Sequence, residues 1–382
     1  MSVLSASPVA RASDSWSVGR RLSGAIRSLI LTSIVLAVSG AAAIHSASAE
    51  IGVAYLPRQA VWVLLGIVVM AVSALLDYHF VLRLAVWLYA VGVVAVTLIL
   101  IFGHEAGGAR SWVGVAGLGG QPSDFAKLAT VLLLTHFLGG VRLEMLELRH
   151  VAVSALIVGV PVGLIALQPD LGGAAMFGPI LIGIVFVAGV RARLVVGGAA
   201  IVLLLGGALF FFGMKDYQRE RILSFVSPQH DPLGAGYQIR QSKIAVGSGA
   251  VLGKGYMQGT QSQLRFLPAR HTDFVFAVVA EESGFLGVAF ILGLYGVWMA
   301  SGLRIALRAR DRQGLLLAAG LLSAIAAHVL YNTGMVIGLV PVTGIPLPFL
   351  SYGGSFTLFC FAATGLLIGI DRRRYVNRAR AR

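Results

Sequence analysis

The sequence predicts an all-α polytopic membrane protein, and three observations support this. Of the 382 residues, 57% are hydrophobic and only 12% are charged, and the mean hydropathy is +0.86. Soluble domains average about 25% charged residues, so the composition excludes an ordinary soluble fold. The apolar residues also gather into runs long enough to cross a hydrocarbon core of about 30 Å. At that depth a helix satisfies its own backbone polar groups.

Ten apolar runs predict ten transmembrane helices. They cover residues 28–44, 59–76, 81–102, 122–138, 151–167, 171–189, 193–214, 274–303, 314–339 and 355–370. The first run is followed by Ala47-Ser48-Ala49, which resembles a signal-peptidase site. Because this run is longer than a usual signal sequence and more spans follow, we expect it to be retained.

The spans divide the chain into five regions with a predicted orientation. These are a cytoplasmic tail (1–25), spans one to seven (26–214), a large extracytoplasmic loop (215–273), spans eight to ten (274–370) and a basic cytoplasmic tail (371–382). With the N-terminus inside, most Lys and Arg residues fall in the tails and inner loops, and the short outer loops hold only Arg58 and Arg110. Both termini are therefore predicted to be cytoplasmic. The net charge of +14 then follows from topology and needs no nucleic-acid partner.

Several classes of site have no support in the sequence. A single cysteine, Cys360, excludes an intramolecular disulfide and a cysteine-based metal cluster. The chain has no P-loop, no GxGxxG motif opening a helix, no HExxH and no GxSxG. ATP use, zinc hydrolysis and serine hydrolysis are therefore not indicated.

Charged residues at the start of predicted span four form a first candidate site. Asp124 and Lys127 lie three residues apart on one helical face and can pair. One interpretation is a helix capped by Ser123, with Trp112 as an interfacial anchor. The other is that Arg110, Asp124 and Lys127 line an outward-facing polar cavity that handles an anion. In the next connection, Asp170 is expected to cap span six.

The large loop 215–273 is basic and forms a second candidate site. An amphipathic helix over residues 237–246, which includes Lys243, is predicted to lie on the membrane surface. The glycine-containing turns 247–249 and 253–255 are able to bring backbone N–H groups to an oxyanion. The loop either contacts anionic lipid head groups or binds a diphosphate, and guanidinium geometry suits the diphosphate.

Asp273 is the candidate for chemistry. It ends the loop, close to Arg265, Arg270 and His271. A carboxylate at the water edge is well placed to take a proton from a sugar hydroxyl beside a bound phosphate. Alternatively, Thr272 or Asp273 merely caps span eight, and the helix N-terminus would then weaken Asp273 as a base.

Two further features lie beside this site. Glu281 and Glu282 stand inside predicted span eight, and at least one is expected to point into the bundle because charges at that depth are costly. Residues 338–355 hold three prolines and several glycines, which preclude a continuous helix. Irregular backbone at membrane depth must be buried in protein or line a cavity, and Asn332 is expected to brace it.

Long motifs in the chain resemble the SEDS glycosyltransferases, the RodA, FtsW and SpoVE group of peptidoglycan polymerases. The motifs are QPSDFAK, QPDLG, QSKIAVGSGAVLGKG, GTQSQLRFLPARHTDFVFAVVAEESGFLG and GLVPVTGIPLPFLSYGGS. The segment GKGYMQGTQSQLRFLP is more similar to the RodA branch, which serves cell elongation. The resemblance implies a ten-span, GT-C-like fold in the bacterial cytoplasmic membrane that polymerises lipid II on its outer side.

The resemblance also implies roles for individual residues. Asp273 would be the general base that lets the GlcNAc 4-hydroxyl of lipid II attack the anomeric carbon of an undecaprenyl-diphosphate-linked glycan, with inversion. The expected substrate-binding residues are Arg110, Trp112, Asp124, Lys127, Lys243, Arg265, Arg270 and His271. The family usually has Glu where this chain has Asp124. The Asp side chain is shorter by one methylene, so its reach toward any contact is smaller.

The resemblance implies a class B penicillin-binding protein as partner, since the chain has no transpeptidase motif. No cofactor is required, because one base and cationic stabilisation of the diphosphate can suffice; Mg²⁺ or another divalent cation could assist. A lipid II flippase and a scaffold for the transpeptidase are the alternatives. A flippase needs polar residues through the membrane, whereas the charges within the spans, mainly Lys127, Glu281 and Glu282, lie toward the outer half.

Overall fold

The computed structural model describes most of the chain as one bundle of helices. The described residues are 23–49, 55–102, 104–106, 109–115, 118–141, 145–194, 196–198, 200 and 234–379. Most of predicted span seven, the first part of the large loop, most of the N-terminal tail and the end of the C-terminal tail lie outside them.

Eight segments of the described chain are long and apolar enough to cross a membrane. They are α1 (Gly24–Ser48), α2 (Tyr55–Leu75), α4 (Ala85–Phe102), α6 (Leu148–Leu167), α7 and α8 (Leu171–Ala175 and Phe177–Gly189), α13 (Val275–Leu307), α14 (Arg312–Val336) and α15 (Gly354–Ala379). The prediction of a multi-pass helical membrane protein is confirmed. The predicted number of ten spans is not, because one span falls outside the described residues and α5 (Pro122–Gly139) is too polar to qualify.

A small antiparallel sheet departs from the all-α prediction. β1 (His104–Ala106), β2 (Ala109–Val115) and β3 (Leu118–Gly120) are hydrogen-bonded in that order, where the sequence predicted a loop. Trp112, Val113 and Val115 are residue types that favour strands. The many glycines around them weaken the alternating pattern by which a strand is recognised.

Segments far apart in the sequence pack side by side. α1 lies along α13, and α2 lies along α15. Glycines allow close approaches in this part of the bundle. A Cβ at Gly365 of α15 would meet the backbone of Met70 in α2, and one at Gly40 of α1 would meet the backbone of Leu350, which lies just before α15. The amphipathic helix predicted over 237–246 is α11 (Ala235–Ser248), which packs on α13 and α14.

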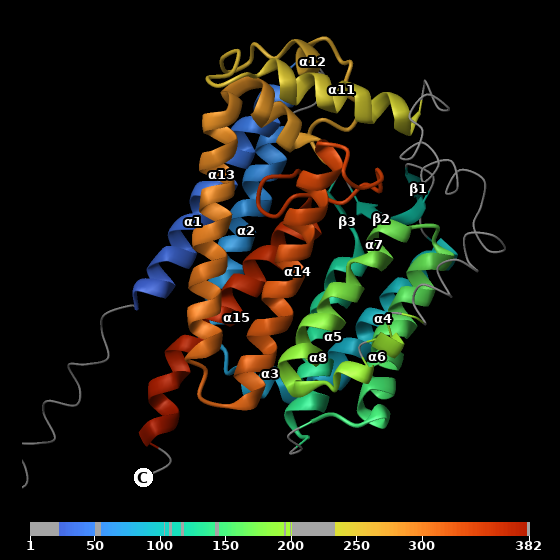
Figure 1. The fold of residues 1–382 in the computed structure, drawn as a ribbon, viewed down its shortest axis with the longest axis vertical. Coiled ribbons are helices and arrows are strands. Elements are labelled where there is room, and N and C mark those ends of the chain that lie inside the picture. Colours follow the sequence, from blue (N-terminus) through green and yellow to red (C-terminus); the bar gives the residue numbers. More distant parts are fainter. Residues whose placement is uncertain are drawn as a thin grey trace, which may run out of the picture.

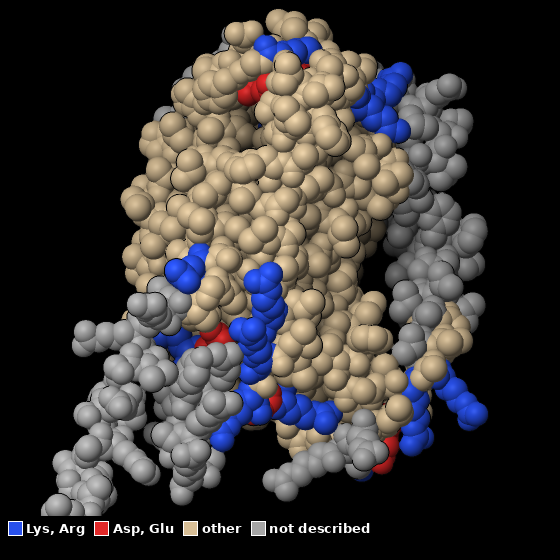
Figure 2. Space-filling model, turned by 60° about the vertical axis from the view of Figure 1, so that its left-hand side comes forward, with Lys and Arg blue, Asp and Glu red and all other residues tan. Residues whose placement is uncertain are grey.

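The two ends of the bundle differ in what they carry. Figure 1 shows α11 and α12 (Thr260–Gln263) across one end, with the sheet nearby, whereas α3 (Tyr78–Arg83) and the C-terminal part of α15 lie at the other end. Figure 2 shows Lys and Arg gathered toward both ends, with a broad band between them that is almost free of charge. The pattern is that expected of a protein embedded in a bilayer.

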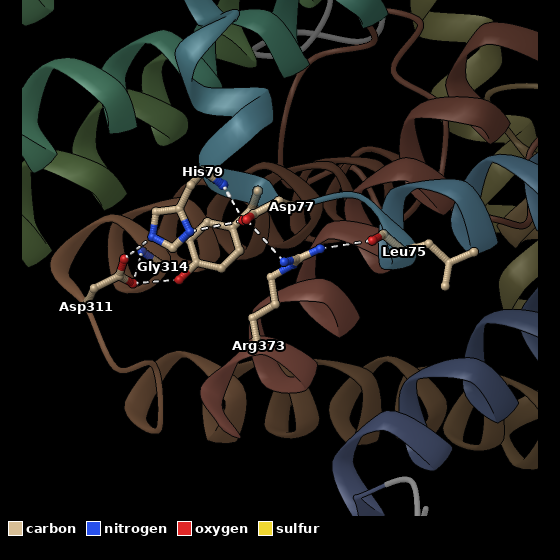
Figure 3. Close-up of polar contacts among 7 residues, drawn as sticks. Leu75, Asp77, His79, Asp311, Gly314 and Arg373 are labelled. Atoms are coloured by element: carbon tan, nitrogen blue, oxygen red, sulfur yellow. Dashed lines mark hydrogen bonds and ion pairs between the residues drawn. The ribbon is translucent and has the colours of Figure 1, made fainter. Parts of the chain in front are cut away.

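A polar cluster closes the end that carries α3 (Figure 3). The His79 imidazole lies between two carboxylates, with Nδ1 3.1 Å from Asp77 Oδ1 and Nε2 2.6 Å from Asp311 Oδ2. Asp311 also caps α14 by accepting from the Gly314 N–H at 3.0 Å. Arg373 of α15 pairs with Asp77 at 3.1 Å. The cluster therefore ties the α2–α3 corner to α14 and α15.

This cluster predicts an acid-sensitive contribution to stability. Burial raises the pKa of Asp77, but hydrogen bonds from the His79 backbone and side chain, together with Arg373, outweigh it, so the pKa is lowered. The contribution is present above the unfolded pKa of about 3.9 and is lost as pH falls through the folded pKa. Asp77→Asn should therefore destabilise the protein by less than about 1 kcal/mol at pH 7, because the pair is partly exposed. In thermal unfolding in detergent, the difference from wild type should shrink as pH falls below about 4; an equal difference at neutral and at acid pH would contradict this origin.

Candidate active site

Asp273 lies in a tight turn immediately before α13. The N–H groups of Thr272 and Asp273 each donate to the Ala269 carbonyl at 3.1 Å, and that of Phe274 does so at 3.3 Å. Phe274 occupies the N-cap position of α13. The alternative that Thr272 or Asp273 caps this helix is therefore wrong. Asp273 itself is half-buried, as expected for a group between solvent and the bundle.

Asn332 of α14 holds the backbone of this turn by hydrogen bonding. Its Nδ2 donates to the carbonyl of Asp273 at 2.8 Å and to that of Ile345 at 2.7 Å. Ile345 belongs to the irregular segment 338–353 between α14 and α15. The expected bracing by Asn332 is thus present, and it also reaches the turn that holds Asp273.

The segment 338–353 contacts the Asp273 turn at two further points. The Ser351 hydroxyl donates to the Thr272 carbonyl at 2.6 Å, and the Tyr352 N–H donates to the His271 carbonyl at 3.0 Å. Gly344, at φ +72°, lies so close that a Cβ there would be 3.4 Å from Asp273 Oδ2. The carboxylate is therefore held beside a segment with fixed backbone.

His271 belongs to an aromatic cluster at the same end of the bundle. Its ring centroid is 4.4 Å from that of Tyr55 and 6.0 Å from that of Tyr352. Burial lowers the pKa of His271, and the positive charge of Arg270 lowers it further. The ring is therefore neutral at neutral pH. A substrate contact by His271 would use an uncharged aromatic ring.

The two arginines of the loop have different environments. Arg270 is 4% exposed, its Nε donates to the Ala47 carbonyl at 2.5 Å, and its Nη1 donates to the Ser262 carbonyl. These contacts tie the loop to the end of α1. Arg265 is exposed and has φ +62°. Arg265 is therefore better placed than Arg270 to meet an anionic ligand.

Asp124 and Lys127 form the predicted pair within the bundle. Lys127 Nζ lies 2.9 Å from Asp124 Oδ1, and the side chains are only 4% and 5% exposed. Asp124 Oδ2 accepts from the Ser355 hydroxyl at 2.7 Å, and the ammonium lies 5.4 Å from the centre of the Phe356 ring. Gln121 is the N-cap of α5. The prediction that Ser123 caps this helix is wrong, because Pro122 already occupies its first position.

The remaining predicted site residues lie at the same end of the molecule. Arg110 and Trp112 are in β2, where they face Glu105 and His104 of β1 in the register. Lys243 is exposed on α11, and a Cβ at Gly338 would lie 2.6 Å from its Nζ. Asp170 caps α7, as predicted, by accepting from the Gly173 N–H at 2.8 Å.

Glu281 anchors residues 249–263 to α13 near a break in that helix. Gly284 has φ +64°, which interrupts the helix. Just before it, Glu281 Oε1 lies 2.7 Å from Lys254 Nζ and accepts from the Gln261 N–H at 3.0 Å. The Ser262 N–H donates to Oε2 at 3.3 Å. The buried carboxylate is therefore fully engaged in holding the loop.

Glu282 points elsewhere, toward α1, where it accepts from the Ser46 hydroxyl. The N–H groups of Lys254 and Gly255 donate at 3.0 Å to the carbonyls of Glu281 and Glu282. The prediction that turn 253–255 offers free N–H groups to an oxyanion is therefore wrong. The other predicted turn, 247–249, is the last part of α11 and its cap, and the Gly249 N–H donates to the Val246 carbonyl at 3.3 Å.

Gly253 allows residues 249–263 to pack closely against α13, and its substitution tests this packing. It has φ +79°, and a Cβ there would collide with the Glu282 carbonyl oxygen. Gly253→Ala should lower the stability by about 2 kcal/mol, because both the conformation and the space exclude a side chain. Gly247→Ala is the matched control, since Gly247 lies within α11 with nothing within 4 Å of its Cβ position. Thermal unfolding should show a loss for the first variant only; equal midpoints would disprove the tight approach.

Among the described residues, no group of three or more His, Cys, Asp or Glu side chains could hold a metal ion. The buried carboxylates of Asp124 and Glu281 are paired with Lys127 and Lys254.

Comparison with known proteins identifies the family. The FtsW/RodA/SpoVE family model, described as cell cycle protein, matches residues 21–376. The chain belongs to this family. Peptidoglycan glycosyltransferase MrdB of Escherichia coli K12 is 38% identical over 346 residues, which cover 91% of this chain and 93% of MrdB. Stage V sporulation protein E of Bacillus subtilis is 38% identical over 355 residues, covering 90% and 96% of the two chains.

Solved structures of FtsW/RodA/SpoVE proteins share the fold. RodA of Thermus thermophilus superposes with a TM-score of 0.67 at 30% identity and covers 91% of this chain and 96% of RodA. A chain from a peptidoglycan synthase complex, studied for the coordination of polymerization and crosslinking, superposes with a TM-score of 0.78 at 34% identity, covering 91% and 97%. The overall arrangement of helices is therefore similar to that of these solved structures.

One buried residue of this FtsW/RodA/SpoVE chain was missed by the sequence reasoning. His328 of α14 is 1% exposed, and its Nε2 lies 3.3 Å from Lys127 Nζ. The signal for it was a polar side chain inside an apolar span, of the same kind as Asn332. Without the fold, nothing in the sequence indicates which span faces it.

Proposed function

We propose that this chain polymerises lipid II into glycan strands on the outer side of the bacterial cytoplasmic membrane, for cell elongation and cell shape. It is a peptidoglycan glycosyltransferase of the SEDS family. The observation that carries the proposal is the placement of Asp273, a half-buried carboxylate in a turn held by α14 and by segment 338–353. Similarity to MrdB and RodA favours the elongation role over division.

The proposed reaction needs one base and one good leaving group. Asp273 takes the proton of the GlcNAc 4-hydroxyl of lipid II while that oxygen bonds to the anomeric carbon of the growing strand. The bond from that carbon to undecaprenyl diphosphate breaks on the opposite face, so the configuration inverts. A second catalytic carboxylate, as in glycosidases, is not required, because the diphosphate departs without protonation once its charge is neutralised.

The proposed binding residues fall into two groups. Arg265 and Lys243 are exposed and supply positive charge for the diphosphate. Asp124 and Lys127 are closed inside the bundle, so a role for them in substrate binding requires that the bound lipid reach them from the side of the sheet. Arg110 and Trp112, on the neighbouring strand β2, are the proposed contacts on that approach.

The finer topology is part of the proposal. It has ten spans, with α5 as the fourth and the seventh within residues 193–214. The Arg-bearing ends of α13 and α15 are cytoplasmic, and Asp273 is outside. Support comes from the placement of α11, α12 and the sheet at the end opposite the C-terminal part of α15 (Figure 1). A class B penicillin-binding protein is the proposed partner, since a similar chain occurs in a peptidoglycan synthase complex.

Transport of lipid II is the second candidate considered, and it is less well supported. An alternating-access site would need polar groups at the membrane midplane. The buried glutamates instead have partners near one end of α13. Glu281 pairs with Lys254 and accepts from the loop backbone, and Glu282 accepts from the Ser46 hydroxyl. They therefore act as anchors of the outer loop.

The test is polymerisation of labelled lipid II by the purified protein with its class B partner, followed by gel analysis of glycan products. Long glycan strands are expected from the complex. Absence of glycan, with lipid II translocation retained in liposomes, would support the flippase instead. A transpeptidase inactivated at its own active site keeps crosslinking from obscuring the product.

A further inference from the structure

Two buried polar side chains of α14 lie one helical turn apart. His328 is 1% exposed and Asn332 is 0% exposed, and the other buried residues of this helix are apolar or glycine. A spacing of four residues places both on one face. We call His328 and Asn332 the α14 polar ridge.

The contacts of His328 define its protonation. Its Nδ1 lies 3.2 Å from the Pro346 carbonyl oxygen, which only accepts hydrogen bonds, so Nδ1 carries the proton. Its Nε2 lies 3.3 Å from Lys127 Nζ and accepts from this ammonium. A doubly protonated ring would bring two positive charges together in a buried place, so the imidazole is neutral. His328 thus connects the Asp124–Lys127 pair to segment 338–353.

Asn332 makes the parallel connection to the active-site turn. It holds the carbonyls of Ile345 at 2.7 Å and of Asp273 at 2.8 Å. The ridge therefore forms hydrogen bonds to two neighbouring carbonyls of segment 338–353. Asn332 bonds to that of Ile345, and His328 bonds to that of Pro346. Gly344, the residue before them, packs against the Asp273 carboxylate.

We propose that the α14 polar ridge sets the position of Asp273 relative to the Asp124–Lys127 pair, and that His328 is a positioning residue for glycan transfer. This rests on the proposed function. His328 acts through Lys127 and Pro346. If the hydrogen bond to Pro346 is lost, the segment that packs against the carboxylate is free to shift. Misplacement of a reacting group by about 1 Å can cost a hundredfold in rate.

Glutamine and leucine separate this role from simple packing. In His328→Gln, the amide NH₂ can donate to Pro346 while the amide oxygen accepts from Lys127. In His328→Leu, both hydrogen bonds are lost but the site stays filled. Thr135→Val is the control, because Thr135 is buried in α5 and its hydroxyl has no hydrogen-bond partner among the described residues.

Polymerisation of lipid II by the complex should fall about tenfold in kcat for His328→Leu, with KM within about twofold, and stay within about threefold of wild type for His328→Gln. Hydrogen exchange gives a readout that does not depend on activity. Amides of residues 269–274 and 344–352 should exchange faster in the leucine variant only. Exchange in α1 and α6 should be unchanged, which a general loss of stability would not allow.

Two results would overturn the proposal. One is a leucine variant with wild-type kcat and wild-type exchange, and the other is a glutamine variant as impaired as leucine. If the wild-type complex makes no glycan, the proposed function itself fails. The exchange pattern then still decides whether the ridge holds the turn of Asp273 in place.

Discussion

Asp273→Asn should abolish glycan synthesis. Asparagine has nearly the same shape as aspartate but cannot accept the proton of the attacking hydroxyl at neutral pH. The loss of a general base typically costs 10²- to 10⁴-fold in rate, so we expect at least about a hundredfold loss of kcat. The fold should survive, because Asn332 holds the turn through the backbone carbonyl of residue 273, which the substitution keeps.

The assay is polymerisation of labelled lipid II by the complex, with thermal unfolding as a check that each variant is folded. Asp170→Asn is the matched control at the same end of the molecule. Asp170 caps α7 through its side chain, and asparagine is an equally good N-cap. Wild-type activity in Asp273→Asn would remove this residue from catalysis, and equal loss in both variants would point to general damage.

The membrane class was predictable because it depends on summed composition. The long apolar runs located most helices, since the hydrophobic thickness of a bilayer requires them. The split into α3 and α4 and the break in α13 at Gly284 were not visible. The break in α13 arises where tertiary contacts hold the backbone, since the N–H groups of Phe285 and Leu286 donate to the carbonyls of Ala250 and Val251. Local hydropathy is insensitive to such contacts.

Chemistry at the site was only partly predictable. Spacing alone identified the pairing of Asp124 with Lys127 and the capping by Asp170. Proximity in sequence does not give side-chain direction at Arg270, which shares the loop with Asp273 and donates to the carbonyls of Ala47 and Ser262. Its partner segments lie more than two hundred residues away or on the far side of a turn. Side-chain direction in a loop depends on partners that the sequence does not place.

Lys127→Met should strongly destabilise the protein, and a second substitution should restore most of the loss. The Asp124 side chain is only 5% exposed. Removal of the Lys127 ammonium leaves this buried carboxylate without its cation. Breaking a buried ion pair from one side typically costs about 3–5 kcal/mol, whereas replacing both charges is far less costly. Asp124→Asn with Lys127→Met should therefore recover most of the stability, since asparagine still accepts from Ser355. Thermal unfolding of the two single variants and the double variant measures this.

The double variant also separates structure from function at this pair. If the pair only joins α5 to α14 and α15, a double variant that is stably folded should polymerise lipid II at a rate within a fewfold of wild type. If the ammonium acts on the substrate diphosphate, the double variant should be stable yet lose at least about tenfold in kcat/KM. A double variant no more stable than Lys127→Met would contradict the buried ion pair itself. The geometry favours a mainly structural contribution, because the ammonium of Lys127 already has Asp124, His328 and the Phe356 ring as partners.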